Sequence, residues 1–293
     1  MESQLYRNSR ESRVFDAANL VLLAAAAIAT LYPLVYVVVV SLSAAHIPNR
    51  FFFLWPEQPG LAAYDLVFRN ALLLRSFLNS VVYAGGAALL SVVLTLTTAY
   101  PLSIRTLPGR KAVMFFITFT LIFNGGLVPY YLVVKALGLV NTPWAMIVPG
   151  SLSAFNVILA RTYLQETIPA ELREAATVDG ASDWTILLRI VVPLSRPIIA
   201  VVALFTGVGV WNAYLPALLF LSDQNLYPVA MILRDIVVGS TLVTNVPPQL
   251  ATQTSSIAVQ AATLVLAMLP IACVYPFLQR FFARGLLIGA IKG

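Results

Sequence analysis

The chain has 293 residues, of which 60% are hydrophobic and 10% charged, whereas a soluble globular domain is nearer to half apolar and a quarter charged. The apolar residues come in long blocks, which predicts membrane spans and excludes a single large soluble core. The formal net charge is +6, but Lys and Arg cluster at the ends of the apolar runs, where they act as topology signals, so this charge does not indicate nucleic acid binding.

The first uncharged run covers residues 17–42. At about 1.5 Å per residue it is long enough to cross a hydrocarbon layer of about 30 Å. It is too long for a signal-peptide core and follows a polar tail, residues 1–16, so we predict an uncleaved first span. Five more uncharged runs follow at residues 76–104, 112–134, 136–160, 197–222 and 257–278. The sequence therefore predicts an all-α, polytopic protein with six transmembrane helices within residues 17–280.

Helix-breaking residues interrupt the third run and also separate it from the fourth run. Asn124, Gly125 and Gly126 interrupt the third run. Inside a bilayer such a break is stable only against protein or a wet cavity, although a simple helix kink explains it equally well. Gly138 is predicted to cap the end of this helix. The sequence Asn141-Thr142-Pro143 predicts a side-chain cap followed by a proline in the first turn of the fourth helix.

The distribution of Lys and Arg predicts the orientation of the spans. One set of loops and tails holds thirteen: Arg7, Arg10, Arg13, Arg105, Arg110, Lys111, Arg161, Arg173, Arg189, Arg196, Arg280, Arg284 and Lys292. The other set holds five: Arg50, Arg69, Arg75, Lys135 and Arg234. Because cytoplasmic loops carry the excess of basic residues, both termini, the charged segment 166–195 and the tail 281–293 are predicted to be cytoplasmic.

The two long loops on the predicted outer side are residues 43–75 and 223–256. The first is expected to contain a short surface helix at residues 61–70. Together the loops could form a platform for an extracytoplasmic partner, or they could only cap the bundle.

The charged segment 166–195 has the signals of two short helices. Thr167 or a neighbour is predicted to cap a helix that starts at Pro169, a favoured first-turn residue. Gly180 is predicted to end it in a left-handed conformation. Ser182 is predicted to cap a second helix that runs to Pro193. The segment should therefore present two helices at an angle, joined by a tight corner.

This segment is suited to contact with a soluble partner protein. Ala175, Ala176 and Ala181 are small enough for another protein to approach the backbone closely, and Glu174 could pair with a cation there. An amphipathic helix pair on the lipid headgroups is the alternative. We disfavour it because such helices carry Lys and Arg on their polar face, whereas this segment is acidic between Glu166 and Asp183.

Glu174-Ala175-Ala176, followed after three residues by Gly180 and later by Ile190 and Pro193, resembles the EAA motif of ATP-binding-cassette importer permeases. The leucine that this pattern places before the proline is Val192 here. By this resemblance the ATPase-coupling residues are Glu174, Ala175, Ala176, Asp179, Gly180, Ala181, Ser182, Ile190 and Pro193. Residues 123–129, 137–142 and 211–212 resemble permeases for oligosaccharides and polysaccharide fragments, alginate oligosaccharides among them. The tail 279–293 resembles that of the second permease in maltose-type importers.

The resemblance implies a type I importer permease fold in the inner membrane of a bacterium. It also implies a heterodimer with a second permease subunit, two ATP-binding subunits and an extracytoplasmic solute-binding protein. This chain would be a transport subunit without enzymatic activity, since residues 285–293 lack the Gly-Lys-Ser/Thr ending of a phosphate-binding loop. ATP and Mg would be bound by the partner ATPases, and no cofactor or metal is expected in this chain. Oligosaccharides would cross by alternating access.

The predicted spans contain no Asp, Glu, Lys, Arg or His. This argues against the alternative function, a self-sufficient secondary sugar carrier or facilitator, because a proton-coupled carrier normally has titratable groups in the membrane. Neutral polar residues remain as candidates for the substrate pathway. Trp211, Asn212 and Tyr214 are preferred because they fall within one turn, and Asn124 and Asn156 are further candidates. For each of them a hydrogen bond between helices is the competing interpretation.

Overall fold

The computed structural model describes residues 10–43, 54–56, 58–123, 125–237 and 256–290. Within these ranges the secondary structure is helical apart from one isolated bridge between Ser43 and Pro59. The chain divides into two units, Met1–Asn70 with Val243–Leu266, and Ala71–Leu242 with Ala267–Gly293. We call them unit 1 and unit 2. The helix α15, Ser256–Ala290, begins in unit 1 and ends in unit 2.

Unit 1 contains α1, Arg10–Ser41, and the short helix α2, Ala62–Arg69. The hydroxyl groups of Ser41 and Tyr64 lie 2.7 Å apart and join the two helices. The N–H of Gly60 donates to the carbonyl of Leu42 at 2.8 Å. The short helix predicted at residues 61–70 is thereby confirmed.

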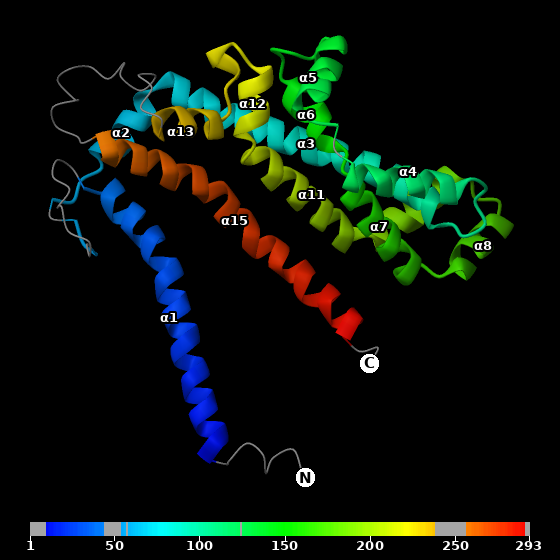
Figure 1. Ribbon diagram of the computed structural model, residues 1–293. Coiled ribbons are helices and arrows are strands. Elements are labelled where there is room, and N and C mark those ends of the chain that lie inside the picture. The colour runs from blue at the N-terminus through cyan, green and yellow to red at the C-terminus, as the bar shows by residue number, and fades with distance from the viewer. Residues whose placement is uncertain (1–9, 44–53, 57, 124, 238–255, 291–293) are drawn as a thin grey trace. The chain divides into compact units, whose positions relative to one another are not determined.

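Unit 2 is organised around α3, Ala71–Ser103, which at about 1.5 Å per residue is about 50 Å long. It packs against α11 (Arg196–Trp211), α7 (Ala154–Thr167) and α6 (Trp144–Ser151) (Figure 1). The buried face of α3 carries many small side chains, among them Ser76, Ser80, Ala87, Ser91 and Ala99. Small residues allow membrane helices to approach closely, which explains why α3 can contact three partners.

One end of α3 is joined to the segment that follows α12, Tyr214–Phe220. The amide of Asn79 donates to the carbonyls of Asn225 and Tyr227 at 2.8 and 3.1 Å. The hydroxyl of Ser80 accepts from the N–H of Val229 at 2.8 Å. This segment forms a 3-10 turn, Gln224–Leu226, and α13, Val229–Val237. The predicted outer loop 223–256 is therefore helical over much of its described part, and its remainder, 238–255, lies outside the described residues.

The opposite end of α3 is held by charged and amide side chains. Arg110 and Arg161 both donate from Nε to the carbonyl of Leu102, at 2.9 and 3.1 Å. Gln165 donates from Nε2 to the carbonyl of Ser103 at 3.0 Å. These bonds satisfy carbonyls that a helix C-terminus leaves without intrahelical partners. They fix the ends of α4 and α7 beside the end of α3.

The described residues contain three helices long and apolar enough to cross a membrane: Val14–Ser41, Ala71–Ser103 and Ile257–Val274. Two bent pairs also qualify, α6 with α7, bent by 47°, and Asp183–Leu194 with α11, bent by 81°. The third predicted run is divided into α4, Arg110–Ile122, and α5, Leu127–Ala136. Gly126 between them has φ +86° and ψ 171°, so the interruption is a true break and not the simple kink considered above.

The two predicted caps around the fourth run had different outcomes. Gly138 has φ +69°, and its own N–H and that of Leu139 bond back to Lys135 and Val134 at 2.9 and 3.2 Å. This Schellman arrangement confirms the glycine cap. The side-chain cap before Pro143 is wrong.

The fourth helix, α6, begins only at Trp144, and its N-cap residue, Pro143, makes no side-chain cap bond. Asn141 instead has φ +59°, and its Oδ1 accepts from the N–H groups of Ser222 and Asp223 at 3.0 and 2.9 Å. The carboxamide is thus used by the chain after α12. A partner distant in sequence has replaced the local one.

Candidate functional site

The segment that resembles the coupling region forms α8, Ala170–Val178, after α7 ends at Thr167. Pro169 is the N-cap residue and makes no side-chain cap bond. The prediction that Thr167 caps a helix starting at Pro169 is therefore wrong by one position. Pro169 has ψ 144°, and as a cap it turns the chain out of α7 without losing an intrahelical N–H bond.

Gly180 makes the predicted corner. Its φ is +81°. Its N–H bonds to the carbonyl of Thr177 at 3.0 Å, and the N–H of Ala181 bonds to the carbonyl of Ala176 at 2.9 Å. This pair of bonds is a Schellman motif, in which the left-handed residue is usually glycine. The prediction for Gly180 is confirmed.

The second helix begins as predicted and ends later. The Ser182 hydroxyl accepts from the N–H of Thr185 at 3.2 Å, which confirms it as the cap. The helix runs through α9 (Asp183–Ile186), a π turn (Leu187–Val191) and α10 (Val192–Leu194). Pro193 lies inside it, so the predicted end at this residue is wrong. A proline interrupts α-helical pairing because it has no N–H. The π turn directly before it absorbs the altered pairing, and the chain bends only at Ser195.

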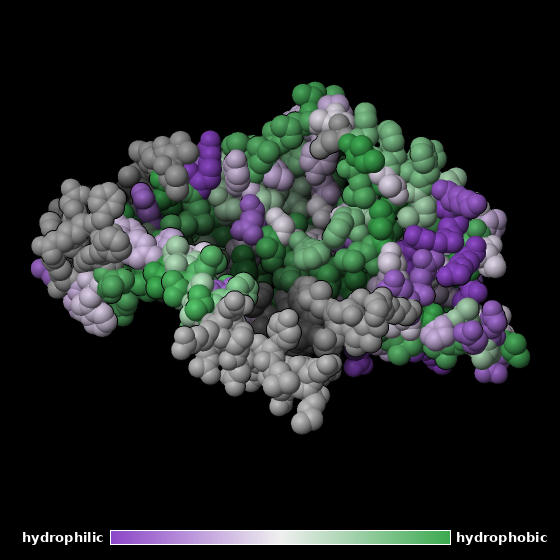
Figure 2. Space-filling view, turned by 60° about the horizontal axis from the view of Figure 1, so that its bottom comes forward, coloured by the Kyte–Doolittle hydropathy of each residue, from purple (hydrophilic) through white to green (hydrophobic). Residues whose placement is uncertain are grey.

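The residues of this segment face two ways. Ala176, Ala181 and Ile190 are half-buried against the core formed by α3, α7 and α9. The other predicted coupling residues are exposed: Glu174, Ala175, Asp179, Gly180, Ser182 and Pro193. Large apolar side chains are exposed beside them, with Val178 at 88% and Trp184 at 65%. Figure 2 shows hydrophilic residues gathered at the end of unit 2 that carries α8, with apolar residues along the bundle.

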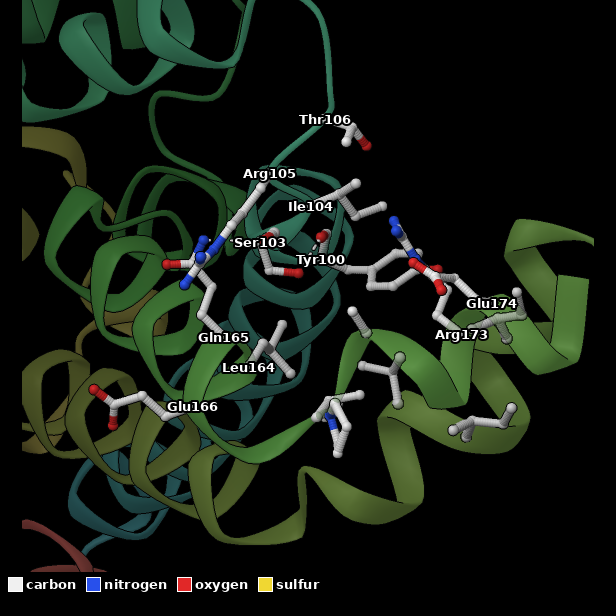
Figure 3. A pocket seen from close by; sticks show the side chains of 16 residues that line it. Tyr100, Ser103, Ile104, Arg105, Thr106, Leu164, Gln165, Glu166, Arg173 and Glu174 are labelled. Atoms are coloured by element: carbon white, nitrogen blue, oxygen red, sulfur yellow. Dashed lines mark hydrogen bonds between the residues drawn. The ribbon is translucent and has the colours of Figure 1, made fainter.

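A cavity of about 520 Å³ lies between α8 and the ends of α3 and α7 (Figure 3). Its apolar wall includes Leu164, Ile186, Ile190 and Val191. Its polar wall includes Tyr100, Arg105, Gln165, Arg173 and Glu174. The Tyr100 hydroxyl is buried and has no hydrogen-bond partner among the residues that the structure describes.

The predicted pathway residues do not form one cluster. Trp211 is buried in unit 2 and donates from Nε1 to the carbonyl of Ala267 at 3.2 Å. The helix ends at this residue, so Trp211, Asn212 and Tyr214 do not share a helical turn as assumed. Asn212 is exposed, with its amide on the carbonyl of Val208, and Tyr214 is 46% exposed. Asn124 lies outside the described residues.

Asn156 is part of a buried polar chain that links three helices. Its Nδ2 donates to Thr206 Oγ1 at 3.2 Å, and that hydroxyl donates to Ser91 Oγ at 2.9 Å. All three side chains are buried. This geometry is the hydrogen bond between helices that the sequence left open as the alternative to a substrate contact.

Within the described part of the chain, no group of three or more His, Cys, Asp or Glu side chains could hold a metal ion. This end of the molecule exposes charged and large apolar side chains on α8 and α9, with a cavity behind them.

Helices long and apolar enough to cross a membrane, with a charged and exposed segment at α8 and α9, are features of an integral membrane protein. The profile of the binding-protein-dependent transport system inner membrane component family matches residues 3–288. The chain belongs to this family. This confirms the predicted class, a sugar permease component of an ATP-binding-cassette importer.

Three known proteins are similar to this chain over most of its length. Protein LplC of Bacillus subtilis is 38% identical, over 100% of this chain and 99% of its own. The polygalacturonan/rhamnogalacturonan transport system permease protein YtcP of the same organism is 36% identical, over 97% of this chain and 100% of its own. A crystal structure of a bacterial ABC transporter involved in the import of the acidic polysaccharide alginate matches with a TM-score of 0.87 and 32% identity, over 94% of this chain and 98% of that one.

Sequence reasoning missed the cavity and its Tyr100. Tyr100 lies in the second uncharged run, where one more aromatic residue gives no signal. The cavity joins side chains from three separate stretches of sequence, and no single stretch contains its pattern. The Arg and Glu members were seen only as topology and coupling signals.

Proposed function

We propose that this permease imports oligosaccharides derived from acidic polysaccharides, together with a second permease subunit, two ATP-binding subunits and an extracytoplasmic solute-binding protein. ATP and Mg would be bound by the ATP-binding subunits. The membrane would be the inner membrane of a bacterium, with both termini in the cytoplasm. Movement of the coupling segment would switch the bundle between inward-facing and outward-facing forms.

The observation that carries the proposal is the projecting corner of α8, Gly180 and α9. It exposes Glu174 and Asp179 beside the apolar side chains of Val178 and Trp184. An exposed surface that mixes large apolar and charged side chains is typical of a protein contact. α8 has no buried residue, so its outer face is available to an ATPase groove. The helix from Asp183 to Leu194 adjoins α11 through the bend at Ser195, so a displacement of the corner can reach the bundle.

The break in the third span supports the proposal of a second permease subunit. α4 has no buried residue, and Ile122, Phe123 and Val128 beside the break are 86%, 61% and 69% exposed. A broken backbone at membrane depth needs protein or water beside it. We assign α4 and α5 together to the third of the six spans, with the second permease and a wet sugar path against the break.

The substrate class rests on the relatives. YtcP is named for polygalacturonan and rhamnogalacturonan, and the matching crystal structure belongs to an importer of alginate. Galacturonan and alginate are both chains of uronic acids. A uronate oligosaccharide combines hydroxyl groups, which neutral polar side chains can bind, with carboxylates.

Reconstitution tests the proposal. The complete complex in proteoliposomes should take up trigalacturonate when its binding protein and ATP are supplied, and it should take up maltotriose poorly. The same chain reconstituted alone should transport neither sugar. Uptake by the chain alone would identify a secondary carrier and overturn the proposal, and preferred uptake of maltotriose by the complex would overturn the substrate class.

A further inference from the structure

We propose that the cavity behind α8 is a binding site for a small sugar acid, such as a uronate released on the cytoplasmic side. The site shares Glu174 and Ile190 with the predicted coupling residues, whereas Tyr100, Arg105 and Arg173 are not among them. The identity of the sugar acid as the transported product rests on the proposed function, whereas the binding chemistry follows from the residues of the cavity.

The size and walls of the cavity suit a molecule of this kind. Its volume of about 520 Å³ lies within the range of about 300–1,000 Å³ that is usual for small-molecule sites. Ile186, Ile190 and Val191 form an apolar wall. A pyranose ring offers a face of C–H groups that can lie against such a wall and a rim of hydroxyl groups that cannot.

Tyr100 supplies an unused hydrogen-bonding group. The residue is 8% exposed, and its Oη is buried without a hydrogen-bond partner in the described part of the chain. Buried hydroxyl groups are nearly always hydrogen-bonded, and leaving one unpaired costs about 1–3 kcal/mol. A ligand oxygen in the cavity would satisfy this hydroxyl, and a carboxylate would do so with a charge-assisted bond.

Charged side chains surround the cavity without pairing. Arg173 and Glu174 lie on the same side as Tyr100, and Arg105 lies on the other side near Gln165 (Figure 3). In the described part of the chain none of these three charged residues forms an ion pair. Arg173 can bind a carboxylate, and Glu174 can accept from sugar hydroxyls.

The mixed charge selects among ligands. A phosphate dianion or an anionic lipid headgroup would meet the carboxylates of Glu166 and Glu174, which also line the cavity. A neutral sugar would leave the cations unused. A sugar acid carries both carboxylate and hydroxyl groups, so it can use Arg105 and Arg173 together with the Tyr100 hydroxyl and the Glu174 carboxylate.

The test places a reporter at the rim of the cavity in the complete complex. The complex is assembled in nanodiscs with cysteine-free partner subunits, and this chain carries Cys273→Ser and Thr106→Cys labelled with an environment-sensitive fluorophore. Thr106 lines the cavity from an exposed turn. Digalacturonate is titrated against its neutral counterpart, digalactose. Stimulation of ATP hydrolysis by the loaded binding protein is measured in the same nanodiscs, so the proposed function is tested separately.

Digalacturonate should give a saturable signal, and digalactose should bind at least tenfold more weakly. Tyr100→Phe keeps the ring and should weaken binding about tenfold or more, as loss of a bond to a charged group does. Arg173→Gln should weaken it similarly. Tyr163→Phe is the matched control, because its hydroxyl reaches the carbonyl of Leu194 outside the cavity lining at 3.4 Å. The proposal is overturned if the complex hydrolyses ATP normally and the label does not respond, or if Tyr100→Phe binds as the parent does.

Discussion

Glycine is required at position 180 because of the backbone conformation, and not because a larger side chain would lack space. Its φ is +81°, and a Cβ built there would have no heavy atom within 4 Å. A left-handed conformation costs an ordinary residue roughly 1–2 kcal/mol, whereas glycine and, to a lesser degree, asparagine adopt it. The corner is therefore specified by a torsion angle.

We expect Gly180→Val to impair coupling and Gly180→Asn to preserve most of it. Valine is β-branched and disfavours positive φ, so the angle between α8 and α9 should change although no clash arises. Copurification of the ATPases and uptake by the complex would be measured for both variants. Equal behaviour of the valine and asparagine variants would show that the left-handed conformation is not needed.

Glu174→Lys should leave the protein inserted and uncouple ATP hydrolysis from uptake, because it reverses the charge that α8 offers to the ATPase. Hydrolysis and uptake would be measured on the same vesicles. Glu171→Lys is the control, since Glu171 is exposed on the same helix and belongs neither to the motif nor to the cavity lining. Normal uptake by the Glu174 variant would contradict the coupling role.

Residues whose roles are local were predictable, and residues whose partners are distant were not. Gly180 and Ser182 act through backbone groups within five positions, so their sequence context determines them. Asn141 bonds to residues 81 and 82 positions away, and Asn156 to one 50 positions away. An asparagine in an apolar run has the same sequence signal whether it binds a sugar or another helix.

At the scale of the helices, the buried chain Asn156–Thr206–Ser91 ties α7, α11 and α3 together. Hydrogen bonds of this kind contribute on average about 0.6 kcal/mol each in membrane proteins. Removing their shared member would also leave the Asn156 amide buried and unpaired, which costs about 1–3 kcal/mol.

Thr206→Val keeps the side-chain volume and should lower the free energy of unfolding by about 1–3 kcal/mol. The measurement is thermal denaturation of the purified complex in detergent. Thr97→Val is the matched control, because the Thr97 hydroxyl bonds only to carbonyls of its own helix. If the Thr206 variant keeps its stability but changes its sugar preference, Asn156 belongs to the pathway as first predicted.

The positions of the helices and the breaks marked by glycine were predictable, but several helix ends were not. Apolar runs indicate where a chain can cross a membrane, and five of the six runs coincide with a long helix or a bent pair. Apolarity contains no information on whether a run continues through Gly126 or stops at Trp211. The π turn before Pro193 likewise has no signal in the apolar pattern.

In unit 2, arginine side chains form hydrogen bonds at both ends of α3. Arg75 bonds to Asn225 at one end, while Arg110 and Arg161 bond to Leu102 at the other. The distribution of Lys and Arg predicted that Arg75 and the pair Arg110 and Arg161 lie at opposite ends of the bundle, because loops on the cytoplasmic side carry the excess of basic residues. The packing of α3 against its neighbouring helices could not be predicted from the sequence, because small residues are compatible with many helix pairings.

The proposed orientation predicts accessibility from each side of the membrane. In a Cys273→Ser background, Val178→Cys should react with an impermeant maleimide only after the cells are permeabilised, because α8 is assigned to the cytoplasm. Asp223→Cys should react in cells in which the outer layer of the envelope, but not the inner membrane, has been permeabilised. Both positions are exposed, so a failure to react reports sidedness. The reverse pattern would invert the topology.

The exposure of Trp184 has a spectroscopic consequence. Its indole is 65% exposed on the coupling segment, whereas that of Trp211 is 7% exposed and hydrogen-bonded. Indole emission shifts to shorter wavelength when water is removed from the ring. The chain therefore carries its own optical reporter at the surface assigned to the ATPase. With the other tryptophans replaced by phenylalanine, docking of the ATPase could be followed in time without any added label.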